Sequence, residues 1–356
     1  MSGEEEKEVR PLILASASLE KTSDEAFPRV ADWEIYQRFN AGLLQYDDLQ
    51  INPHLRRIEE AIRLDFSLAR RGLSLIDGHN VIFSTSEKVG IPLLALQTRR
   101  AAVPHVMLGH HLLSPLKFRF LKTTGLLRKL SLLLCLSREE LRLLRLHSGL
   151  PPERVVMLEG VVTDHRFFLP APGHGEGFVL STGATLRDYP TLMRALGGLP
   201  IKVVIASGSQ WVKGSESKGK IPSNFTFLPK QSLKQMRDLY ARCAVVVIPL
   251  HRGTQHSAGR TTATEAMASA KPLVATDLPG MRDYVTPGRN GLLVEEGSEI
   301  ALREAIKGML ANEKWAIALG LAGRQLTETK WNIELYVNDL CRLLRQVVQG
   351  SEAPQV

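Results

Sequence analysis

The amino-acid sequence predicts an α/β protein made of two doubly wound, Rossmann-like domains that face each other across a cleft. Two observations carry this prediction. The chain has 356 residues, which is more than one compact domain of ordinary size usually contains, so two domains are expected. Short apolar runs alternate with helical patterns along most of the chain, and this alternation is typical of parallel sheets connected by crossover helices.

The first half of the chain contains five short apolar runs that are predicted to be buried strands. They are residues 12–15, 81–84, 105–108, 132–136 and 155–158. Between the first two strands, residues 53–72 predict one long amphipathic helix, because apolar residues recur there at spacings of three and four. These apolar positions are Leu55, Ile58, Ile62 and Phe66. Further on, Ser137 and Glu140 form a capping box that predicts the start of another helix.

The second half repeats the alternation after a segment rich in proline and glycine. Residues 171–177 of that segment are predicted to be a linker between domains. The predicted strands are residues 178–182, 202–206, 225–228, 244–249, 272–276 and 291–294. The predicted helices are residues 189–196, 232–241, 261–269 and 299–310. The expected domains are therefore residues 9–170 and 178–330, with a disordered tail over residues 1–8 and a C-terminal helix, residues 331–349, that could pack back on the first domain.

Composition places the chain among globular proteins of a reducing compartment. Apolar residues make up 44% of the sequence and charged residues 23%, which is typical of such domains. No apolar run is long enough for a membrane-spanning helix, and the acidic N-terminus has no signal-peptide pattern, so a cytoplasmic location is expected. The three cysteines, Cys135, Cys243 and Cys341, are far apart and predict buried thiols rather than a metal site.

The net charge of +8 is compatible with a solvated basic surface or with an anionic partner. Between residues 116 and 130, basic and apolar residues interleave. This pattern predicts either an amphipathic segment on an anionic membrane surface or a helix whose other face is core. Nucleic acid is the weakest candidate partner, because no recognition helix, zinc finger or aromatic RNA-binding sheet is visible and only 6% of residues are aromatic.

A loop rich in small and hydroxyl residues precedes the predicted helix at residues 261–269. Free backbone N–H groups and the helix dipole make such a helix start an anion site. Glycine at position 259 would let the backbone approach a phosphate closely. The candidate phosphate-binding residues are Ser257, Gly259, Arg260, Thr261 and Thr262. Plain N-capping by Ser257 or Thr261 is the alternative interpretation.

The sequence that follows this loop resembles the C-terminal domain of glycosyltransferase family 4, which has the GT-B fold. The resemblance rests on Thr264-Glu-Ala-Met-Ala-Ser-Ala-Lys-Pro-Leu-Val-Ala-Thr, Pro279-Gly-Met-Arg-Asp-Tyr-Val and Gly288-Arg-Asn-Gly-Leu-Leu-Val. In the first half, Val81-Ile-Phe-Ser-Thr-Ser-Glu-Lys and Gly109-His-His are similar to the family's pattern, as is Phe167-Phe-Leu-Pro. The resemblance is closest over residues 178–330, weaker over 77–170 and weakest before residue 75.

This resemblance implies transfer of a sugar from a nucleoside diphosphate donor with retention at the anomeric carbon. It implies no metal and no cofactor, because basic side chains and helix N-termini neutralise the leaving diphosphate. Arg187 matches a basic position that contacts the diphosphate, and Glu265 matches the second carboxylate of the family's Glu-x7-Glu motif, a ribose binder. Ser257 stands where the first carboxylate is expected, which leaves the donor sugar and the level of activity open.

The resemblance also implies a donor-sugar histidine in the first domain, and His110 is preferred over its neighbour His111. Glu87 follows the preceding strand and is a candidate for binding acceptor hydroxyls on this side of the cleft. The region expected to border the nucleobase contains Gly208, Leu228 and Pro229. The acceptor itself is a glycan, a lipid or a small molecule. A non-catalytic nucleotide- or glycan-binding relative is the alternative, motivated by Ser257.

Overall fold

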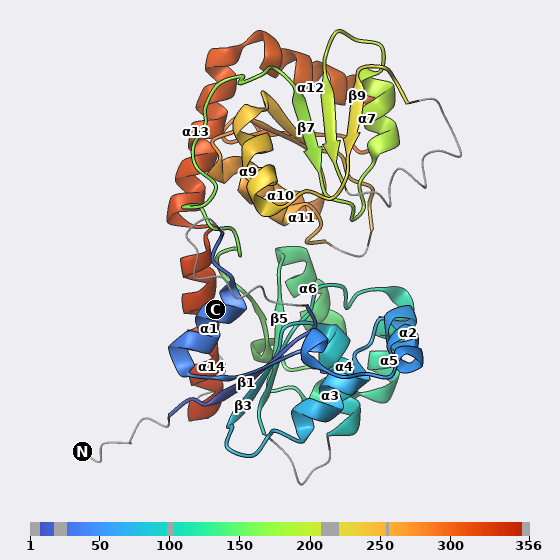
Figure 1. Cartoon of the computed structure of the whole chain (residues 1–356), viewed down its shortest axis with the longest axis vertical. Helices are drawn as coiled ribbons and strands as arrows, with labels where there is room; N and C mark the ends of the chain where they lie inside the picture. Colours follow the sequence, from blue (N-terminus) through green and yellow to red (C-terminus); the bar gives the residue numbers. More distant parts are fainter. Residues whose placement is uncertain (1–7, 18–26, 98–102, 208–220, 254–255, 351–356) are drawn as a thin grey trace, which may run out of the picture. The chain divides into compact units, whose positions relative to one another are not determined.

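The computed structural model describes residues 8–17, 27–97, 103–207, 221–253 and 256–350 (Figure 1). The chain forms two compact units. The N-terminal unit contains the described start of the chain (residues 8–17), Val30–Glu159 and the chain from Tyr336 onward. The C-terminal unit contains Gly160–Leu335 with the short segment that ends at Arg29. No helix in the described ranges is long and apolar enough to cross a membrane.

The N-terminal unit is built on a parallel sheet of six strands in the order β2-β1-β3-β4-β5-β6. The strands are β1 (Pro11–Ala15), β2 (Gly42–Gln45), β3 (Val81–Ser84), β4 (His105–Leu108), β5 (Leu132–Cys135) and β6 (Val155–Met157). All five strands predicted in this half are present. The sequence pattern missed β2, a four-residue strand at the sheet edge that is only partly buried and therefore lacks a continuous apolar run.

Helices of the N-terminal unit connect these strands. They are α1 (Ala31–Phe39), α2 (Pro53–Ile62), α3 (Phe66–Leu73), α4 (Glu87–Leu96), α5 (Pro115–Thr124) and α6 (Arg138–His147), with short 3-10 turns η1 (Tyr46–Asp48), η3 (Leu126–Lys129) and η4 (Pro152–Arg154). The predicted N-cap of α6 is confirmed, because the Ser137 hydroxyl accepts a hydrogen bond from the Glu140 N–H at 3.2 Å. The Glu140 side chain accepts from the Leu136 N–H at 3.1 Å, one residue before the N-cap that the predicted capping box would use. The last helix, α14 (Ile333–Gln349), lies in this unit from Tyr336 onward.

The prediction of one long helix over residues 53–72 is wrong in two respects. The chain forms two helices there, because Arg63 adopts a left-handed conformation with φ 56° and ends α2. The apolar stripe does not face the core either. Leu55, Ile58, Ile62 and Phe66 are 43%, 56%, 50% and 38% exposed, whereas Glu59 of the same turns is 1% exposed. An amphipathic pattern predicts which residues share a face but not which way that face points.

The C-terminal unit contains a second parallel sheet, in the order β12-β11-β10-β7-β8-β9. Its strands are β7 (Val179–Thr182), β8 (Val203–Ala206), β9 (Phe225–Leu228), β10 (Val245–Ile248), β11 (Leu273–Thr276) and β12 (Leu292–Val294). Its helices are α7 (Tyr189–Leu196), α9 (Leu233–Arg242), α10 (Arg260–Ala268), α11 (Pro279–Arg282), α12 (Glu299–Ala311) and α13 (Glu313–Thr329). All six predicted strands are present, and the strand order reverses between the neighbours β7 and β10.

Both faces of this sheet are buried, as expected for a doubly wound sheet. Successive residues of β10 enter different cores, because side chains alternate along a strand. Val246 and Ile248 pack in one apolar cluster with Phe178, while Val245 and Val247 pack in the other. The central strands are thereby held rigidly, and the loops at their carboxyl ends are positioned by that packing.

The segment predicted to be the interdomain linker lies inside the C-terminal unit. The unit boundary is at Glu159 and Gly160, well before residues 171–177. Proline and glycine do make this segment a loop, but tertiary hydrogen bonds hold it. The Ala171 N–H donates to the Ser269 carbonyl at 3.0 Å, and the Lys271 ammonium donates to the Gly173 carbonyl at 3.1 Å.

Candidate functional site

The candidate site of the C-terminal unit lies at the carboxyl ends of β7 and β10. These strands are neighbours at the point where the strand order reverses, which is where open α/β sheets bind ligands. Two loops leave the sheet there. The first follows β7 and runs through Arg187, and the second follows β10 and leads into α10.

Arg187 is buried, with only 3% of its surface exposed. Its Nε donates to the Thr182 carbonyl at 2.7 Å, its Nη1 to the Thr185 carbonyl at 3.0 Å and its Nη2 to Thr262 Oγ1 at 2.9 Å. Gly183 makes room for this group. It has φ 87°, and a Cβ there would lie 2.7 Å from Arg187 Nη2. A guanidinium has five N–H donors, and three of them have these partners in the described part of the chain.

A chain of hydroxyl groups connects Arg187 to Glu265. Thr262 Oγ1 lies 3.2 Å from Thr182 Oγ1, which lies 3.2 Å from the Tyr240 hydroxyl. The Tyr240 hydroxyl donates to Glu265 Oε2 at 2.8 Å. Because arginine can only donate and a carboxylate can only accept, each hydroxyl accepts one hydrogen bond and donates the next. The chain therefore runs in one direction from a cation to an anion, an arrangement in which neighbouring bonds strengthen each other.

Burial changes the ionisation of both ends of this chain. Burial raises the pKa of Glu265 from 4.5 to about 7, although Tyr240 and Arg187 oppose the increase. Burial also lowers the pKa of Arg187, against the attraction of Tyr189, Tyr240 and Glu265, and an arginine still remains charged at neutral pH. Glu265 is thus a carboxylate that gains from further hydrogen-bond donors, since these favour its charged form.

The start of α10 has the properties of an anion site. Its N-cap is Gly259, and no side chain of the described residues caps the first N–H groups of the helix. Gly259 has φ 85°, a left-handed conformation, and a Cβ there would lie 3.0 Å from Ile248 and 3.3 Å from both Leu250 and Met281. The Arg260 N–H donates a hydrogen bond to the Ser257 carbonyl at 3.2 Å. Neither Ser257 nor Thr261 is the N-cap, so the plain capping interpretation is not what the structure has.

We expect Gly259→Ala to destabilise the protein by about 1–2 kcal/mol, because alanine is strained in a left-handed conformation and its Cβ would crowd Ile248. Urea denaturation monitored by circular dichroism measures the change. Gly308→Ala is the matched control. Gly308 lies inside α12, and apart from its chain neighbours and its own helix backbone no atom of the described residues lies within 4 Å of the added Cβ. That variant should therefore gain about 0.5–1 kcal/mol. Equal effects of the two substitutions would contradict this account of Gly259.

Arg260 does not join the Arg187 cluster. Its side chain is 5% exposed, and its Nη2 donates to the Gly160 carbonyl at 2.8 Å. Its Nε is buried without a hydrogen-bond partner in the described ranges. The Arg260 guanidinium thus points toward Gly160, the first residue of this part of the C-terminal unit. The anion site at the start of α10 therefore depends on backbone N–H groups and on Arg187.

The residues expected near the nucleobase are only partly described. Leu228 ends β9 and packs against the core that contains Phe178. Pro229 is exposed, and its carbonyl accepts a hydrogen bond from the Gln231 side chain at 2.8 Å. Gly208 lies outside the described residues.

In the N-terminal unit, Glu87 and His110 lie together at the ends of β3 and β4. The His110 N–H donates to Glu87 Oε2 at 2.9 Å, and Lys117 Nζ donates to Glu87 Oε1 at 2.9 Å. Burial alone would raise the pKa of Glu87, but Lys117 and His110 lower it below its ordinary value. Both carboxylate oxygens of Glu87 therefore hold the His110 loop and α5 in place.

The His110 ring is also fixed. Its Nε2 lies 3.0 Å from the Thr85 carbonyl, and a carbonyl can only accept, so this nitrogen carries the hydrogen. His111 lies partly buried beside Lys117, and burial together with that ammonium lowers its pKa. The two histidines thus differ: the His110 ring is held in one orientation by a hydrogen bond from its Nε2, whereas the pKa of His111 is lowered by burial and by Lys117.

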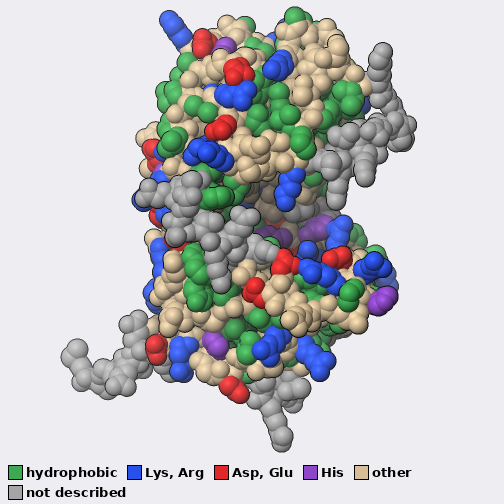
Figure 2. Space-filling model, viewed as in Figure 1, with side chains coloured by type: hydrophobic (Ala, Val, Ile, Leu, Met, Phe, Trp, Pro, Cys, Tyr) green, Lys and Arg blue, Asp and Glu red, His purple; other side chains and the backbone are tan. Residues whose placement is uncertain are grey.

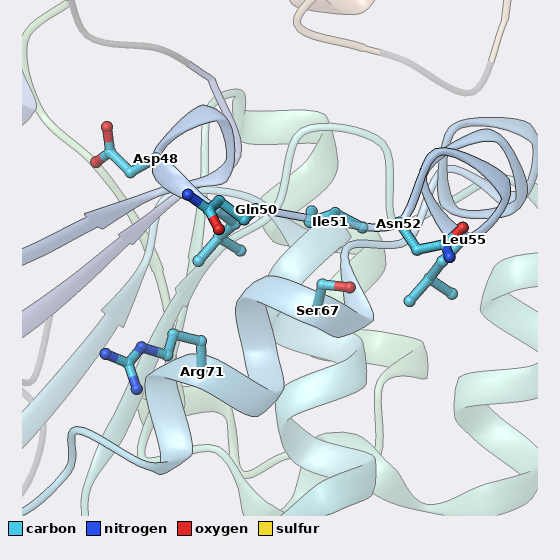
Figure 3. Close-up of a pocket in the computed structure, with 8 residues that line it drawn as sticks. Asp48, Gln50, Ile51, Asn52, Leu55, Ser67 and Arg71 are labelled. Carbon is cyan, nitrogen blue, oxygen red and sulfur yellow. The ribbon is translucent and has the colours of Figure 1, made fainter.

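A separate pocket of about 400 Å³ lies between α2 and α3 of the N-terminal unit (Figure 3). Ser67 and Arg71 of α3 and Leu55 of α2 contribute to its lining, together with residues 48–52. None of the predicted site residues that the structure describes lines this pocket.

Sequence reasoning missed three residues of the site. Thr182 and Tyr240 complete the chain to Glu265, and Lys117 completes the contacts of Glu87. Each is an ordinary residue at the end of a strand or on a helix, and no local motif marks it. Of the three, a search for polar residues at the carboxyl ends of strands would have found Thr182 alone.

Comparison with known proteins relates part of the C-terminal unit to a described family. Residues 185–312 match the model of the family described as Glycosyl transferases group 1. That range contains Arg187, Tyr240, Thr262 and Glu265. The C-terminal unit therefore carries a glycosyltransferase domain.

Two curated relatives illustrate the sequence similarity. A GDP-mannose-dependent alpha-mannosyltransferase of Mycolicibacterium smegmatis is 38% identical over 88 residues, which are 24% of this chain and 22% of that protein. An uncharacterized glycosyltransferase of Methanocaldococcus jannaschii is 28% identical over 106 residues, 30% of this chain and 29% of that protein. The similarity spans less than a third of the length of each relative.

Solved structures extend the comparison to the fold of both units. HepE of Anabaena, in complex with UDP-glucose, has a TM-score of 0.73 at 15% identity and covers 94% of this chain and 99% of that one. Sucrose-phosphate synthase from Thermosynechococcus elongatus has a TM-score of 0.64 at 20% identity over 80% of this chain and 79% of that one. The two six-stranded parallel sheets thus have the GT-B fold, and this prediction is confirmed.

Proposed function

We propose that this protein is a retaining glycosyltransferase, related to family 4, that moves a sugar from a nucleoside diphosphate sugar to a glycan, lipid or small-molecule acceptor without a metal ion. The observation that carries the proposal is the directed chain from Arg187 to Glu265, beside the uncapped start of α10. A nucleoside diphosphate has both parts that this arrangement suits: an anionic diphosphate and a ribose with two neighbouring hydroxyls.

The donor would be bound through two kinds of contact. Glu265 accepts hydrogen bonds from the ribose hydroxyls, because its Oε2 is already oriented by Tyr240 and a carboxylate has lone pairs for several donors. Arg187 and the first N–H groups of α10 stabilise the diphosphate, whose negative charge grows as the bond to the sugar breaks. The UDP-glucose bound to Anabaena HepE supports this class of donor.

During the transfer, the bond between the anomeric carbon and the diphosphate oxygen breaks and an acceptor oxygen bonds to the same carbon. The nucleoside diphosphate leaves, and the acceptor hydroxyl proton leaves with it or with solvent. Retention of configuration and metal independence rest on the resemblance to family 4. His110 is proposed to contact the donor sugar near the reacting carbon, and Glu87 acts on it by holding the His110 backbone.

Ser257 is the main departure from the family pattern, since a carboxylate is expected there. We propose that its hydroxyl contacts the donor sugar or the diphosphate. A second candidate function follows from the same residue: a non-catalytic protein that binds nucleotides or glycans. It retains the Arg187–Glu265 chain and predicts nucleotide binding without turnover.

Thermal unfolding in the presence of nucleoside diphosphates tests the proposal. A ligand at about 100 times its dissociation constant should stabilise the folded state by about 2.7 kcal/mol, so UDP, GDP or ADP should raise the midpoint of unfolding by several degrees. Transfer or donor hydrolysis is then measured with the corresponding sugar nucleotides. Stabilisation with turnover supports the transferase, and stabilisation without turnover supports the non-catalytic alternative. The absence of any stabilisation would reject both.

A further inference from the structure

The helix α2 presents its apolar residues to the outside. Its inward residue is Glu59, whose Oε2 accepts a hydrogen bond from the Tyr46 hydroxyl at 2.6 Å and whose Oε1 accepts one from the Ser67 N–H at 2.6 Å. Rotating the helix to bury its apolar side would break both hydrogen bonds and turn Glu59 outward. The outward direction of Leu55, Ile58 and Ile62 is therefore set by a buried polar anchor.

A short helix of this kind gains little stability by itself, because isolated helices of about ten residues are marginal in water. Burial of an apolar stripe usually supplies the missing stability. In α2 that stripe is about half exposed, so the described residues leave it without a covering element. Single exposed aliphatic residues are common, but several on one helix face indicate a surface that meets a partner.

The neighbouring helix α5 extends this surface. Leu116 is 85% exposed and Phe120 is 50% exposed. Figure 1 shows α2 and α5 side by side, and the contacts agree. Leu64, just after α2, packs in the same apolar cluster as Phe118 of α5. Arg63, at the end of α2, and Lys117, near the start of α5, both lower the pKa of His111 through their positive charge.

The charge on this surface is positive. Exposed basic residues are Arg57 and Arg63 at α2 and Arg119 and Lys122 on α5. The acidic residues of α2 do not cancel them, because Glu59 is buried and Glu60 lies 3.5 Å from another arginine, Arg56. The sequence of α5 contains no acidic residue. Figure 2 shows Lys and Arg side chains on this side of the N-terminal unit, with apolar side chains and some Asp and Glu side chains among them.

We propose that this α2–α5 face docks on the surface of a lipid bilayer that contains anionic lipids. The face is defined by Leu55, Ile58, Ile62, Leu116 and Phe120, with Arg57, Arg63, Arg119 and Lys122 around them. Aliphatic and aromatic side chains on helices rimmed by Lys and Arg match the boundary between acyl chains and anionic headgroups. The proposal goes beyond the 116–130 segment and beyond the transfer reaction, because α2 supplies most of the apolar face.

Flotation of the full chain with lipid vesicles tests this docking. We expect binding to phosphatidylcholine vesicles that contain about 30% phosphatidylglycerol, which creates a negative surface potential, and little binding to phosphatidylcholine alone. The double variant Ile58→Glu and Leu116→Glu should lose about tenfold or more of the binding, because it replaces inserted apolar groups by like charges. In the double variant Arg57→Gln and Lys122→Gln, vesicle binding should fall about fivefold for each charge removed. This loss should be smaller at high salt, which screens the charges.

The matched control is the double variant Ile300→Glu and Leu321→Glu, which changes aliphatic residues that are 72% and 47% exposed on α12 and α13. It should float as the parent protein does. The proposal is overturned if the parent protein does not float with anionic vesicles or if the α2–α5 variants float unchanged. It is also overturned if light scattering shows a dimer that the α2–α5 variants dissociate, because a second copy would then cover the face. Nucleotide-induced thermal stabilisation, measured on the same samples, reports separately on the donor site.

Discussion

Glu265→Ala is expected to weaken nucleoside diphosphate binding about 30- to 150-fold, the equivalent of about 2–3 kcal/mol for hydrogen bonds to a charged group. The variant removes the carboxylate proposed to accept from the ribose. The fold should tolerate the change, because the Tyr240 hydroxyl keeps Thr182 as a partner at 3.2 Å. Isothermal titration calorimetry measures the affinity, and urea denaturation measures the folding.

A charge control separates this effect from a general change in electrostatics. Glu304 lies on α12 with its side chain 64% exposed, and Glu304→Ala should bind the nucleotide as the parent protein does. Unchanged affinity in Glu265→Ala would rule out the ribose role. Tyr240→Phe should give a smaller loss, because it keeps the carboxylate and removes only the hydroxyl that orients it.

The ionisation of Glu265 gives this prediction a pH signature. Since burial raises the pKa of this carboxyl to about 7, its contribution to folding stability is present below 4.5 and is lost as the pH rises through about 7. Nucleotide affinity should change in the opposite direction and increase as the carboxylate forms. In Glu265→Gln the side chain cannot ionise, so folding stability and nucleotide affinity should both depend less on pH. The pH dependence of affinity that remains in this variant belongs to ionisation of the diphosphate. Identical pH profiles for the two proteins would contradict the assigned pKa shift.

His110→Ala is expected to lower kcat about 100- to 1,000-fold, the loss typical when one electrostatic contact to a transition state is removed. The physical reason is that the His110 ring is held by the Thr85 carbonyl and its backbone by Glu87, so it presents one defined orientation to a substrate. Nucleotide binding should change little, because the ribose and diphosphate contacts belong to the C-terminal unit. Steady-state kinetics with a sugar nucleotide measures both quantities.

Two further histidine variants make this test selective. His111→Ala should lower kcat less than about tenfold, within the range of a change in local packing rather than of a lost catalytic contact. His147→Ala changes an exposed residue at the end of α6 and should have no effect. A wild-type kcat in His110→Ala, or a larger loss in His111→Ala, would show that the proposed histidine is the wrong one.

The strands and the binding loop were the features that the sequence predicted best. A buried parallel strand is a short apolar run, and runs such as residues 244–249 can be recognised without knowing their neighbours. The start of α10 is also a local feature, because Gly259 and the small residues before it define the backbone themselves. These features allowed the C-terminal unit to be placed among glycosyltransferases, and the family match over residues 185–312 agrees.

Side-chain partners were not predictable in the same way. Arg187 meets Thr262, 75 positions further along the chain, and Tyr240 meets Glu265, 25 positions away. The sequence predicted a role for both charged residues but no partner for either, because those contacts arise only when β7 and β10 become neighbours. Arg260 shows the opposite case. Its position in the loop predicts a phosphate contact, whereas in the structure its side chain donates a hydrogen bond to the Gly160 carbonyl.

The sequence by itself determined the α/β class, all but one of the strands and the loop that begins α10, because each of these is encoded by residues adjacent in the chain. Only the tertiary structure decided the boundary at Glu159 and Gly160, the chain from Arg187 to Glu265 and the outward face of α2. The physical reason is the same in each case. A periodic pattern specifies which residues lie on one side of an element, but long-range hydrogen bonds, such as those to Glu59, decide where that side points.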